Sequence, residues 1–534
     1  MNFNSEPGVV KLLRASMPEE VGVDSSVVMS YVNEIEKRGY KFDSLMVLRH
    51  GKVAAEFVWR PYDADIPHDM YSFSKTMTAT AIGFAIDEGL LSLDTKIYSF
   101  FPEKYAELNG AQKDYADQMN IHSLLTMRSG KRINMFKDTA KMDWTENYMG
   151  AKFKCAPCTK WDYVSENIYM LAKILTIVTG QSLTEYLTPR LYEPLEMGVP
   201  KWETDPEGVE AGGWGLQLTT EQMAKFSLLY LQGGIWNGKR ILPEKWMKAC
   251  TKKHIDLVPC MIHDGTGYGY QVWLNDNPSY LRFDGLFGQI SVMFKDYDAC
   301  VVFNAADTRE YEYIKMIFDY FPKAFGDDLV MPDENYISNF KAELERKSYD
   351  WSPAMPRNKK AESEIDGKRY RIKPRDNASV LGVTSYFMWS KKPGKMEYIE
   401  FDFSKDVPQF IWKEANSPEN RMDIGMNGDF AYSNAILADI PVIMASQGSW
   451  LKDNKFKLNI HPLGRSQNRQ MVFSFNGKSV KINSKANMNA GDLLVFRLFF
   501  AGMNVPPALK NVISIIIKIA NEIWFDPNLK GTLE

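Results

Sequence analysis

The sequence predicts an α+β unit of about 330 residues followed by a mostly β domain. Strand-like runs at both ends of the first unit enclose a long block with helical periodicity, so one sheet would be built from both ends. Beyond a stretch rich in charge and proline, short β-rich runs alternate with turn signals. We therefore predict a first domain over residues 1–342, a linker over 343–364 and a mostly β domain over 365–534.

Composition places the chain among folded globular proteins and excludes several classes. Of the 534 residues, 45% are hydrophobic and 25% charged, and Lys+Arg 64 against Asp+Glu 67 leaves a net charge of -3. A near-neutral chain has no field that would hold a polyanion, so nucleic acid is not the expected partner. No run of about 18 apolar residues predicts a membrane span, and Met1–Val10 has no signal-peptide pattern. With five cysteines, these features lead us to expect a cytoplasmic protein.

The elements of the first domain follow from periodicity and from helix-ending glycines. Apolar residues at helical spacing end at Gly39, Gly89, Gly180 and Gly233, and His50-Gly51-Lys52 is typical of a hairpin turn. The predicted elements, in order, are a helix over Asp24–Gly39, strands over Ser44–His50 and Val53–Trp59, helices over Ser72–Glu88, Ile168–Val178 and Thr220–Leu231, strands over Tyr268–Leu274, Gln289–Phe294 and Ala299–Asn304, and a helix over Arg309–Phe325.

The second domain shows only β signals until its last segment. Turn sequences such as Asn427-Gly428-Asp429 and Asn476-Gly477-Lys478 separate its runs, which predicts a sandwich or a small barrel. From Val505 onward the pattern fits a helix and a strand equally. The predicted strands include Arg369–Ile372, Tyr398–Phe403, Val442–Ala445, Phe456–Ile460, Met471–Phe475 and Leu493–Phe499.

A serine and a lysine at the start of one predicted helix are the first candidate site. Ser72 and Lys75 are three residues apart, which places them on one face. A lysine there can take the serine proton if its pKa is lowered, and the helix N-terminus supplies an N–H for an oxyanion. The same spacing occurs at Ser338 and Ser449, so spacing by itself is not specific.

Other catalytic and cofactor patterns are missing from the sequence. It has no Gly-x-Ser-x-Gly elbow, no P-loop and no dinucleotide fingerprint. The six histidines are scattered, and none has the spacing of a zinc site. Cys155 and Cys158 have redox spacing, but without a thioredoxin-like context we interpret them as two reduced thiols. We therefore expect no metal and no cofactor.

The surroundings of Ser72 resemble a known family. The stretch HDMYSFSKTMTATAIGFAIDEGLLSLDTKI, His68–Ile97, resembles the nucleophile helix of the serine β-lactamase and penicillin-recognising family. The branch it resembles most holds class C β-lactamases, family VIII-type esterases, D-amino-acid peptidases and 6-aminohexanoate-dimer hydrolases. The likeness covers about residues 15–330 and implies a β-lactamase/transpeptidase-like fold, an antiparallel sheet flanked by helices plus a helical lobe. Four further stretches match in the same order: Ile121–Gly130, Ala156–Leu183, Gly212–Leu242 and Phe283–Phe294.

The resemblance assigns roles to individual residues. Ser72 matches the nucleophile, Lys75 its partner and Tyr163 the tyrosine of the second motif. Lys75 and Tyr163 would form the proton shuttle, with the lysine charge lowering the pKa of the phenol. The alternative for Tyr163 is a core tyrosine with a satisfied hydroxyl. Ser165 stands where Asn is usual, and its hydroxyl could donate to Lys75 or to substrate.

The third motif departs from the family pattern. It reads Phe283-Asp284-Gly285, where the family has Lys-Thr-Gly or His-x-Gly. Gly285 retains the close approach of strand to substrate, and the N–H of Leu286 would be the second oxyanion donor beside that of Ser72. Phenylalanine cannot hold the carboxylate of a β-lactam, so esters or amides without that carboxylate are expected. Asp284 would meet a substrate ammonium or be a structurally idle carboxylate.

The sequence thus predicts a serine hydrolase that acts on an ester or amide through an acyl-enzyme. Trp214 would line the acyl pocket or serve packing. One alternative is a β-lactamase or D-amino-acid peptidase, which the missing signal peptide disfavours. A second is a non-catalytic binding protein on the same fold, against which the retention of Ser72, Lys75 and Tyr163 argues. The expected partner is a small-molecule substrate, and the β domain resembles a cover or a surface for a partner or a second copy.

Overall fold

The structure is a computed structural model, and its description covers most of the chain. The chain divides into two compact units between residues 347 and 348, and each is described by itself. The described residues are 8–132, 143–257, 267–276, 279–346, 357–375, 378–382, 385–386, 389–487 and 528–534.

The first unit is built on an antiparallel sheet that both ends of the unit complete. β1 pairs with β13, with Met46 opposite Val302, so the first strands lie in the sheet beside one of the last. This confirms the predicted α+β organisation and the hairpin around Gly51. In sheet order, the strands are β2 (Lys52–Val58), β1 (Phe42–Arg49), β13 (Ala299–Ala305), β12 (Gln289–Phe294), β11 (Ser279–Gly285), β10 (Trp273–Asp276), β9 (Gly267–Tyr268) and β8 (Ile255–Asp256).

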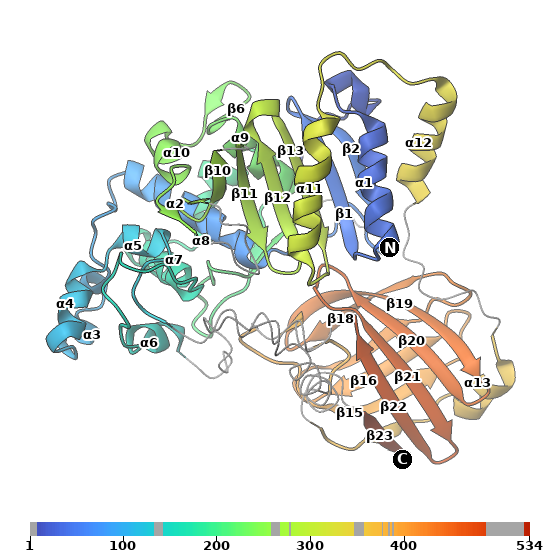
Figure 1. The fold of residues 1–534 in the computed structure, drawn as a ribbon. Helices are drawn as coiled ribbons and strands as arrows, with labels where there is room; N and C mark the ends of the chain where they lie inside the picture. The colour runs from blue at the N-terminus through green and yellow to red at the C-terminus, as the bar shows by residue number, and fades with distance from the viewer. Residues whose placement is uncertain are drawn as a thin grey trace, which may run out of the picture. The chain divides into compact units, whose positions relative to one another are not determined.

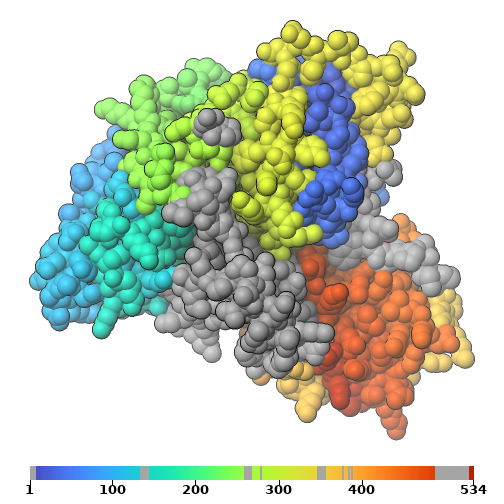
Figure 2. Space-filling model, viewed as in Figure 1, coloured from blue at the N-terminus to red at the C-terminus, as the bar shows by residue number. Residues whose placement is uncertain are grey.

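Two long helices lie together on one face of this sheet. α11 (Glu310–Ala324) packs Tyr313 edge-on against Phe42 of β1, with ring centroids 5.2 Å apart. α1 (Ser25–Lys37) contacts α11 along its length, and Figures 1 and 2 show the two helices side by side. The Asp24 side chain accepts from the backbone N–H groups of Ser26 and Val27 and so caps the start of α1.

The opposite face of the sheet is covered by α9 (Thr220–Leu231). This helix begins with a capping box formed by Thr219 and Gln222, which satisfies backbone N–H groups of its first turn. Thr220 Oγ1 lies 2.5 Å from Ser44 Oγ of β1, so the helix is fixed to the central strands by a polar contact as well as by apolar packing.

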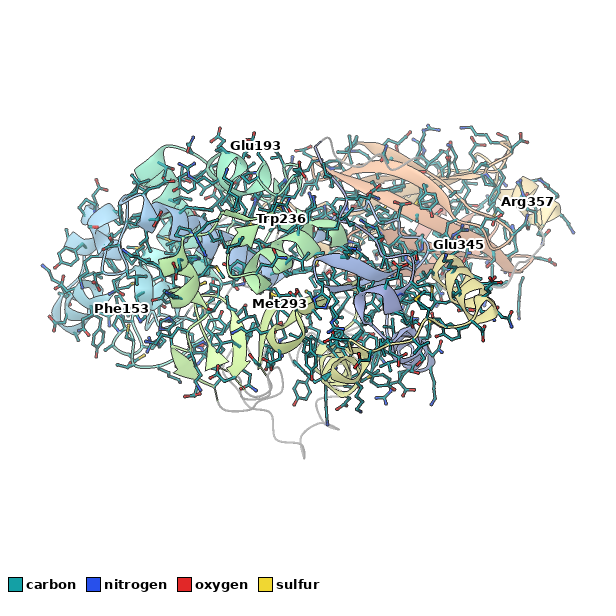
Figure 3. All side chains as sticks on the ribbon, turned by 90° about the horizontal axis from the view of Figure 1, so that it is seen from above. Phe153, Glu193, Trp236, Met293, Glu345 and Arg357 are labelled. Atoms are coloured by element: carbon teal, nitrogen blue, oxygen red, sulfur yellow. The ribbon has the colours of Figure 1, made fainter. Side chains whose placement is uncertain are left out.

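The remaining helices of the unit include a helical lobe beside the sheet. Figure 1 shows α3 to α7 grouped at one side, and Figure 3 places Phe153 among them while Met293 lies in the sheet. The helices are α2 (Ser74–Asp87), α3 (Pro102–Ala106), α4 (Gly110–Gln118), α5 (Ile121–Leu125), α6 (Trp144–Met149), α7 (Glu166–Thr179), α8 (Leu183–Leu187), α10 (Glu244–Cys250) and α12 (Glu334–Arg346). Short strands are β3 (His68–Asp69), β4 (Lys201–Trp202), β5 (Leu216–Leu218), β6 (Ile235–Trp236) and β7 (Lys239–Arg240).

The helix predicted over Ser72–Glu88 begins as a tighter turn. Tyr71–Phe73 form a 3-10 turn, η2, and α2 continues from Ser74. Every residue of α2 from Ser74 to Ala85 is buried, so this helix is central to the unit and polar residues in it must find partners. Gly83 faces Trp246, where a Cβ would lie 2.4 Å from the indole ring, and this glycine therefore permits close packing.

Two predicted elements of the first domain and linker need correction, and one strand lies where none was predicted. The strand predicted over Tyr268–Leu274 is divided into β9 and β10, because Gln271 between them adopts a left-handed φ of 60°. β11 was not singled out by the pattern. The predicted linker is partly helical: α12 extends to Arg346, and α13 (Lys359–Ile365) occupies its other end. Residues 347–356 lie outside the described residues.

The second unit is an antiparallel sheet that curls into a near-barrel, the barrel alternative of the prediction (Figure 1). The two end strands, β17 and β18, lie in contact with each other. In sheet order, the strands are β17 (Glu419–Asp423), β16 (Gln409–Glu414), β15 (Met396–Asp402), β14 (Tyr370–Ile372), β23 (Leu529–Leu533), β22 (Ser479–Ala486), β21 (Arg469–Asn476), β20 (Lys455–Pro462), β19 (Ile440–Lys452) and β18 (Ala431–Leu437).

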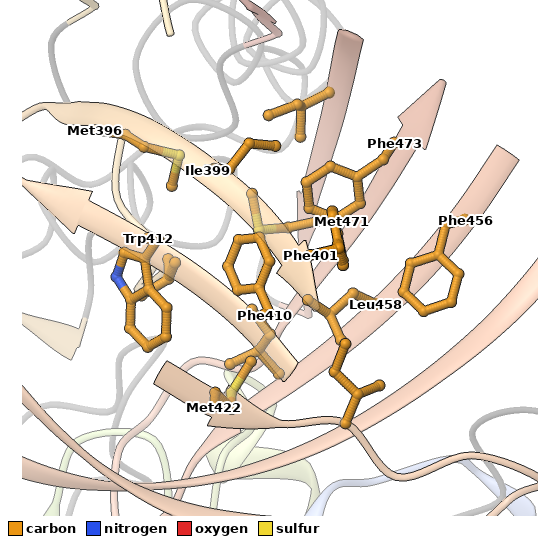
Figure 4. Close-up of a cluster of buried hydrophobic side chains, with 14 of the residues drawn as sticks. Met396, Ile399, Phe401, Phe410, Trp412, Met422, Phe456, Leu458, Met471 and Phe473 are labelled. Atoms are coloured by element: carbon orange, nitrogen blue, oxygen red, sulfur yellow. The ribbon is translucent and has the colours of Figure 1, made fainter. Parts of the chain in front are cut away.

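Alternating side chains of these strands fill the interior with apolar groups. Phe401 of β15 is fully buried and contacts Phe410, Phe456 and Phe473 with ring centroids 5.0–5.5 Å apart (Figure 4). Burial of large aromatic side chains is the main favourable term available to such a fold. The interior around Phe401 is therefore a packed core.

A side-chain amide joins the two end strands. Asn420 of β17 donates from Nδ2 to the carbonyl of Ile436 at 3.0 Å, and its Oδ1 accepts from the Ile436 N–H at 2.8 Å. The amide therefore takes the place of a peptide unit at the position where the strand ladder is interrupted. We call this contact the seam.

The C-terminal segment is described only at its end. The predicted strand Leu493–Phe499 and most of the undecided segment from Val505 lie outside the described residues, and the end of that segment is a strand, β23. Among the helices of the described residues, none has the length and apolar content to cross a membrane.

Candidate active site

Ser72 and Lys75 lie where the 3-10 turn passes into α2. Ser72 is partly exposed, whereas Lys75 has a relative exposure of 2%. Lys75 Nζ lies 2.8 Å from Ser72 Oγ and donates to the carbonyl of Gly213 at 2.7 Å. The Gly213 carbonyl thus orients the amine so that its remaining lone pair, when the amine is neutral, can accept the proton of Ser72.

Burial changes the protonation of Lys75. Desolvation lowers the pKa of Lys75 from its usual value to about 7, and the charge of Glu166 opposes this shift. A lysine with such a pKa is neutral in a large fraction of molecules near neutral pH, as a general base must be. The lowered pKa that the sequence argument required for Lys75 is therefore present.

The loop that carries Gly213 is pressed against the start of α7. A Cβ on Gly213 would lie 2.4 Å from the carbonyl oxygen of Ser165, so only glycine fits. Ser165 is buried directly before α7, as expected for a residue near the site. The expected donation to Lys75 is not found, because the described hydrogen bonds of Lys75 reach Ser72 and Gly213.

Tyr163 lies beside the same pair, but its electrostatics differ from the prediction. Lys75 Nζ is 5.1 Å from the centre of the Tyr163 ring. Burial raises the pKa of Tyr163, a hydrogen bond with Ser72 lowers it, and the charges of Asp284 and Glu310 raise it further. The predicted lowering was wrong in direction, because desolvation exceeds the other effects and the nearby charges are acidic. The phenol therefore keeps its proton at neutral pH.

Aromatic rings back Tyr163 on the side of the sheet. Trp273 of β10 stacks on it with ring centroids 6.2 Å apart, and Trp161 lies at 5.9 Å. Trp273 is buried, while Trp161 and Tyr163 are partly exposed. Tyr163 therefore combines features of both interpretations. Its ring is packed, as in a core tyrosine, and its hydroxyl hydrogen-bonds to the nucleophile, as in a catalytic one.

The end of β11 lies against the turn that carries Ser72. A Cβ on Gly285 would lie 2.2 Å from the carbonyl oxygen of Met70, which explains the glycine. Leu286 follows in a turn and is partly exposed. In the described part of the chain, neither the Ser72 nor the Leu286 N–H has a hydrogen-bond acceptor, so both amides remain available to an oxyanion.

Phe283 is placed differently from the family-based expectation. It is fully buried, and its ring contacts Phe73, Phe226 and Tyr230. A substrate carboxylate cannot reach this side chain, so position 283 is part of the aromatic core in this protein. The expected preference for substrates without a carboxylate therefore gains no support from this side chain.

Asp284 is neither idle nor available as a single charge. The Nε of buried Arg282 donates to both carboxylate oxygens of Asp284 at 2.9 and 3.0 Å. This pair weakens the attraction of Asp284 for a substrate ammonium, although the Asp284 charge still raises the pKa of Tyr163. Trp214 is buried with its ring 4.9 Å from that of Trp144, which favours the packing alternative over an acyl-pocket wall.

Three groups near the nucleophile were missed by the sequence argument. Glu166, buried in the first turn of α7, acts on Lys75 through its charge, and burial raises its pKa to about 7. The Gly213 carbonyl orients Lys75, and Glu310 accepts from the N–H of Phe287. An acidic residue in the first turn of a helix is ordinary, so only Gly213, in a Gly-Gly-Trp-Gly run, carried a sequence signal. Among the described residues, no cluster of His, Cys, Asp and Glu could hold a metal ion.

The chain is similar to two named proteins over part of its length. It is 24% identical over 223 residues to the 6-aminohexanoate-dimer hydrolase of Paenarthrobacter ureafaciens, covering 39% of this chain and 56% of that protein. It is 26% identical over 206 residues to penicillin-binding protein 4 of Amycolatopsis lactamdurans, covering 32% and 52%. The chain thus spans about half the length of these two relatives.

A solved structure aligns with part of the chain, and a family model matches about half of it. The D-stereospecific amidohydrolase of a Streptomyces species aligns with a TM-score of 0.44 and 14% identity, covering 55% of this chain and 98% of that one. The model of the Beta-lactamase family matches residues 33–313, slightly more than half of the chain. The chain therefore belongs to the Beta-lactamase family of serine hydrolases.

Proposed function

We propose that the protein hydrolyses an ester or amide through an acyl-enzyme on Ser72. One observation carries the proposal: a buried amine whose pKa is lowered to about 7 lies 2.8 Å from the Ser72 hydroxyl. A serine hydroxyl needs such a base to become a nucleophile at neutral pH.

In the acylation step, neutral Lys75 takes the proton of Ser72 while Oγ forms a bond to the substrate carbonyl carbon. The negative charge that develops on the carbonyl oxygen is held by the N–H groups of Ser72 and Leu286. The bond to the leaving group then breaks, and the leaving group receives the proton from Lys75, directly or through the hydroxyl of Tyr163. Because the pKa of Tyr163 is raised, its role is that of a proton donor.

Deacylation repeats these steps with water. Lys75, again neutral, takes a proton from a water molecule that attacks the acyl carbonyl, and the same two amides hold the oxyanion. Collapse of the intermediate breaks the bond to Ser72 Oγ, which regains its proton from Lys75. No metal or cofactor takes part in this scheme.

The charges around Ser72 favour substrates without a carboxylate next to the scissile bond. Asp284, although paired with Arg282, raises the pKa of Tyr163, so it opposes a negative charge there. Glu310 acts in the same direction when it is ionised, but burial raises its own pKa and so favours its neutral form at neutral pH. The hydrolase of Paenarthrobacter ureafaciens, named for an amide dimer, supports an amide as one substrate class. Turnover measurements with esters and amides decide between these two substrate classes. The cytoplasmic location stays a prediction.

The direct test labels the nucleophile. The protein is incubated with a fluorophosphonate, and mass spectrometry of a digest locates the label, which we expect on Ser72. Turnover of p-nitrophenyl esters of rising chain length is measured in wild type and in Ser72→Ala. The matched control is Ser338→Ala, because Ser338 and Lys341 have the same spacing on the exposed face of α12.

The outcomes separate the alternatives. Loss of label and turnover in Ser72→Ala, with Ser338→Ala unchanged, supports the proposal, whereas equal turnover in Ser72→Ala and wild type would overturn it. A higher kcat/KM for nitrocefin than for the best ester would place a β-lactamase or D-amino-acid peptidase first. A wild type that neither labels nor turns over any ester or amide would favour the non-catalytic binding protein.

A further inference from the structure

Two bulky residues next to the proposed oxyanion donors have an unusual backbone conformation. Tyr71 precedes Ser72 and has a φ of 45°, and Phe287 follows Leu286 and has a φ of 68°. Few residues other than glycine adopt this left-handed region, and a bulky aromatic there is strained. Glycine would take either conformation without a steric penalty, so the aromatic side chains must contribute something that glycine lacks.

The two side chains contact each other. The rings of Tyr71 and Phe287 meet edge to face, with centroids 5.2 Å apart and planes at 86°. Tyr71 has a relative exposure of 7% and Phe287 of 0%, so the contact is buried. An edge-to-face pair of this kind is a favourable and directional contact. It joins η2, which carries one amide donor, to the turn after β11, which carries the other.

Each side of this contact is fixed to the rest of the unit. On one side, the N–H of Met70 donates to Leu216 at 2.8 Å. On the other, the Phe287 carbonyl accepts from the N–H of Asp307 at 3.1 Å, and the Phe287 N–H donates to the carboxylate of Glu310. Both peptide groups of Phe287 are thus in use, while the N–H of Leu286 is left for a ligand.

We propose that Tyr71 and Phe287, which we call the aromatic clasp, are positioning residues that set the separation of the Ser72 and Leu286 amides. The inference rests on the proposed function. Tyr71 supplies the carbonyl half of the peptide unit whose N–H belongs to Ser72, so its backbone angles aim that N–H. Phe287 closes the turn that aims the N–H of Leu286. The ring contact holds both strained conformations at one spacing, and oxyanion stabilisation depends on that spacing.

The test removes the rings and keeps the backbone. Tyr71→Gly and Phe287→Gly suit a left-handed φ, so the backbone conformation should be kept, but each variant removes a buried ring and should also lower the melting temperature. Activity is therefore measured at a temperature at which thermal melts show every variant to be folded. We expect each variant to lower kcat for a p-nitrophenyl ester about 10- to 100-fold while KM changes less than about threefold, because only the transition state carries the oxyanion. The double variant should lose about as much as either single variant, since both remove the same contact.

Two further variants distinguish positioning from general packing. Tyr71→Phe keeps the ring and should retain kcat within about threefold. Phe321→Ala removes a comparable edge-to-face contact, with Tyr31, at 5.0 Å between α11 and α1, and should lower the melting temperature while leaving kcat unchanged. Affinity for a boronic acid that forms a tetrahedral adduct with serine should fall by the same factor as kcat in the glycine variants.

The outcomes are separable from those of the proposed function. If Ser72→Ala is inactive and the two glycine variants keep the kcat of wild type, the aromatic clasp is overturned and the hydrolase proposal stands. Additive losses in the double variant, or losses confined to KM, would also overturn the clasp. If Ser72→Ala keeps the activity of wild type, the proposed function fails and the clasp fails with it.

Discussion

Each of the two compact units buries a glutamate, and burial raises the pKa of both carboxyl groups to about 7. Their surroundings differ. Glu414 in the near-barrel accepts from the N–H of Val380 at 2.9 Å and from the Ser379 hydroxyl at 3.0 Å. For Glu166 in the first unit, burial raises the pKa, and two effects lower it: a hydrogen bond with its own backbone N–H and the charge of Lys75.

The comparison shows that a perturbed pKa does not by itself identify a functional residue. Glu414 is tied to a neighbouring segment by hydrogen bonds that satisfy its oxygens, so its removal should affect the fold. Glu166 is linked through charge to the base beside the nucleophile, so its removal should affect proton transfer. Variants of the two units should therefore separate stability from activity.

The largest effect should come from Lys75→Met. The variant removes the proposed base, and we expect kcat/KM for an ester to fall about 10²- to 10⁴-fold. The pKa of Lys75 is lower in the folded state than in the unfolded state, so at pH 7 the protonated amine destabilises the fold. An apolar side chain has no such cost, and the free energy of unfolding should therefore be equal or higher in the variant. That gain should disappear above the unfolded-state pKa of lysine. Initial rates and thermal melts measure both, and Lys341→Met on exposed α12 is the control. Full activity in Lys75→Met would contradict the assignment of Lys75 as the general base.

In the near-barrel, Glu414→Leu should act on stability. The Val380 N–H and the Ser379 hydroxyl lose their acceptor in a buried position, and we expect the free energy of unfolding to fall by about 2–4 kcal/mol. Urea denaturation followed by tryptophan fluorescence measures the change, since Trp412 is buried in the same unit. Exposed Glu397→Leu is the matched control and should shift the free energy by less than about 0.5 kcal/mol. Equal stability of the Glu414 and Glu397 variants would refute this assignment.

A smaller loss is expected at the seam. Asn420→Ala removes two partly buried hydrogen bonds to Ile436, which corresponds to about 1–2 kcal/mol of unfolding free energy. Hydrogen exchange at the Ile436 amide should accelerate in parallel. Asn434→Ala, on the exposed face of β18, should change neither quantity. Protection of the Ile436 amide in Asn420→Ala equal to that in wild type would show that the seam is held by other contacts.

The smallest effect should be a shift of the pH profile in Glu166→Gln. In wild type, Lys75 becomes protonated as the pH falls through about 7, so kcat/KM should decrease tenfold per pH unit below that value. The Glu166 charge raises the pKa of Lys75. Removing it should therefore move the acid limb to lower pH, by up to about one unit. Exposed Glu193→Gln is the control. An acid limb that moves to higher pH would show that the Glu166 charge does not raise the pKa of Lys75.

The sequence predicted most of the first sheet because local patterns there agree with the fold. The hairpin of β1 and β2, the helices α7 and α9, and β12 have caps, glycines or alternation at their ends. β9 and β10 were predicted as one strand because β-favouring residues lie on both sides of Gln271, although the Gln271 carbonyl accepts from Thr76 of α2 and the backbone turns there. A tertiary contact of this kind leaves no mark on periodicity.

The site was predicted in its residues more than in its electrostatics. Ser72, Lys75 and Tyr163 are brought together, as the resemblance implied. Burial raises the pKa of Tyr163, and carboxylates of β11 and α11, which are distant in sequence, raise it further, so the direction of the shift could not be derived from the motif. The sequence placed Phe283 near the substrate, and only its packing against aromatic rings in the structure shows that its side chain belongs to the core.

The pairing of β1 with β13 also bears on how the chain is made. Met46 and Val302 are adjacent in the sheet, yet about 250 residues are synthesised between them, at about 5–20 residues per second. Throughout that interval the N-terminal hairpin has an unpaired edge, which is open to pairing with another nascent chain. Contacts of such long sequence separation also slow folding. A ribosome-stalled chain that ends before β13 should therefore recruit a chaperone at this hairpin, and release should follow once β13 has emerged.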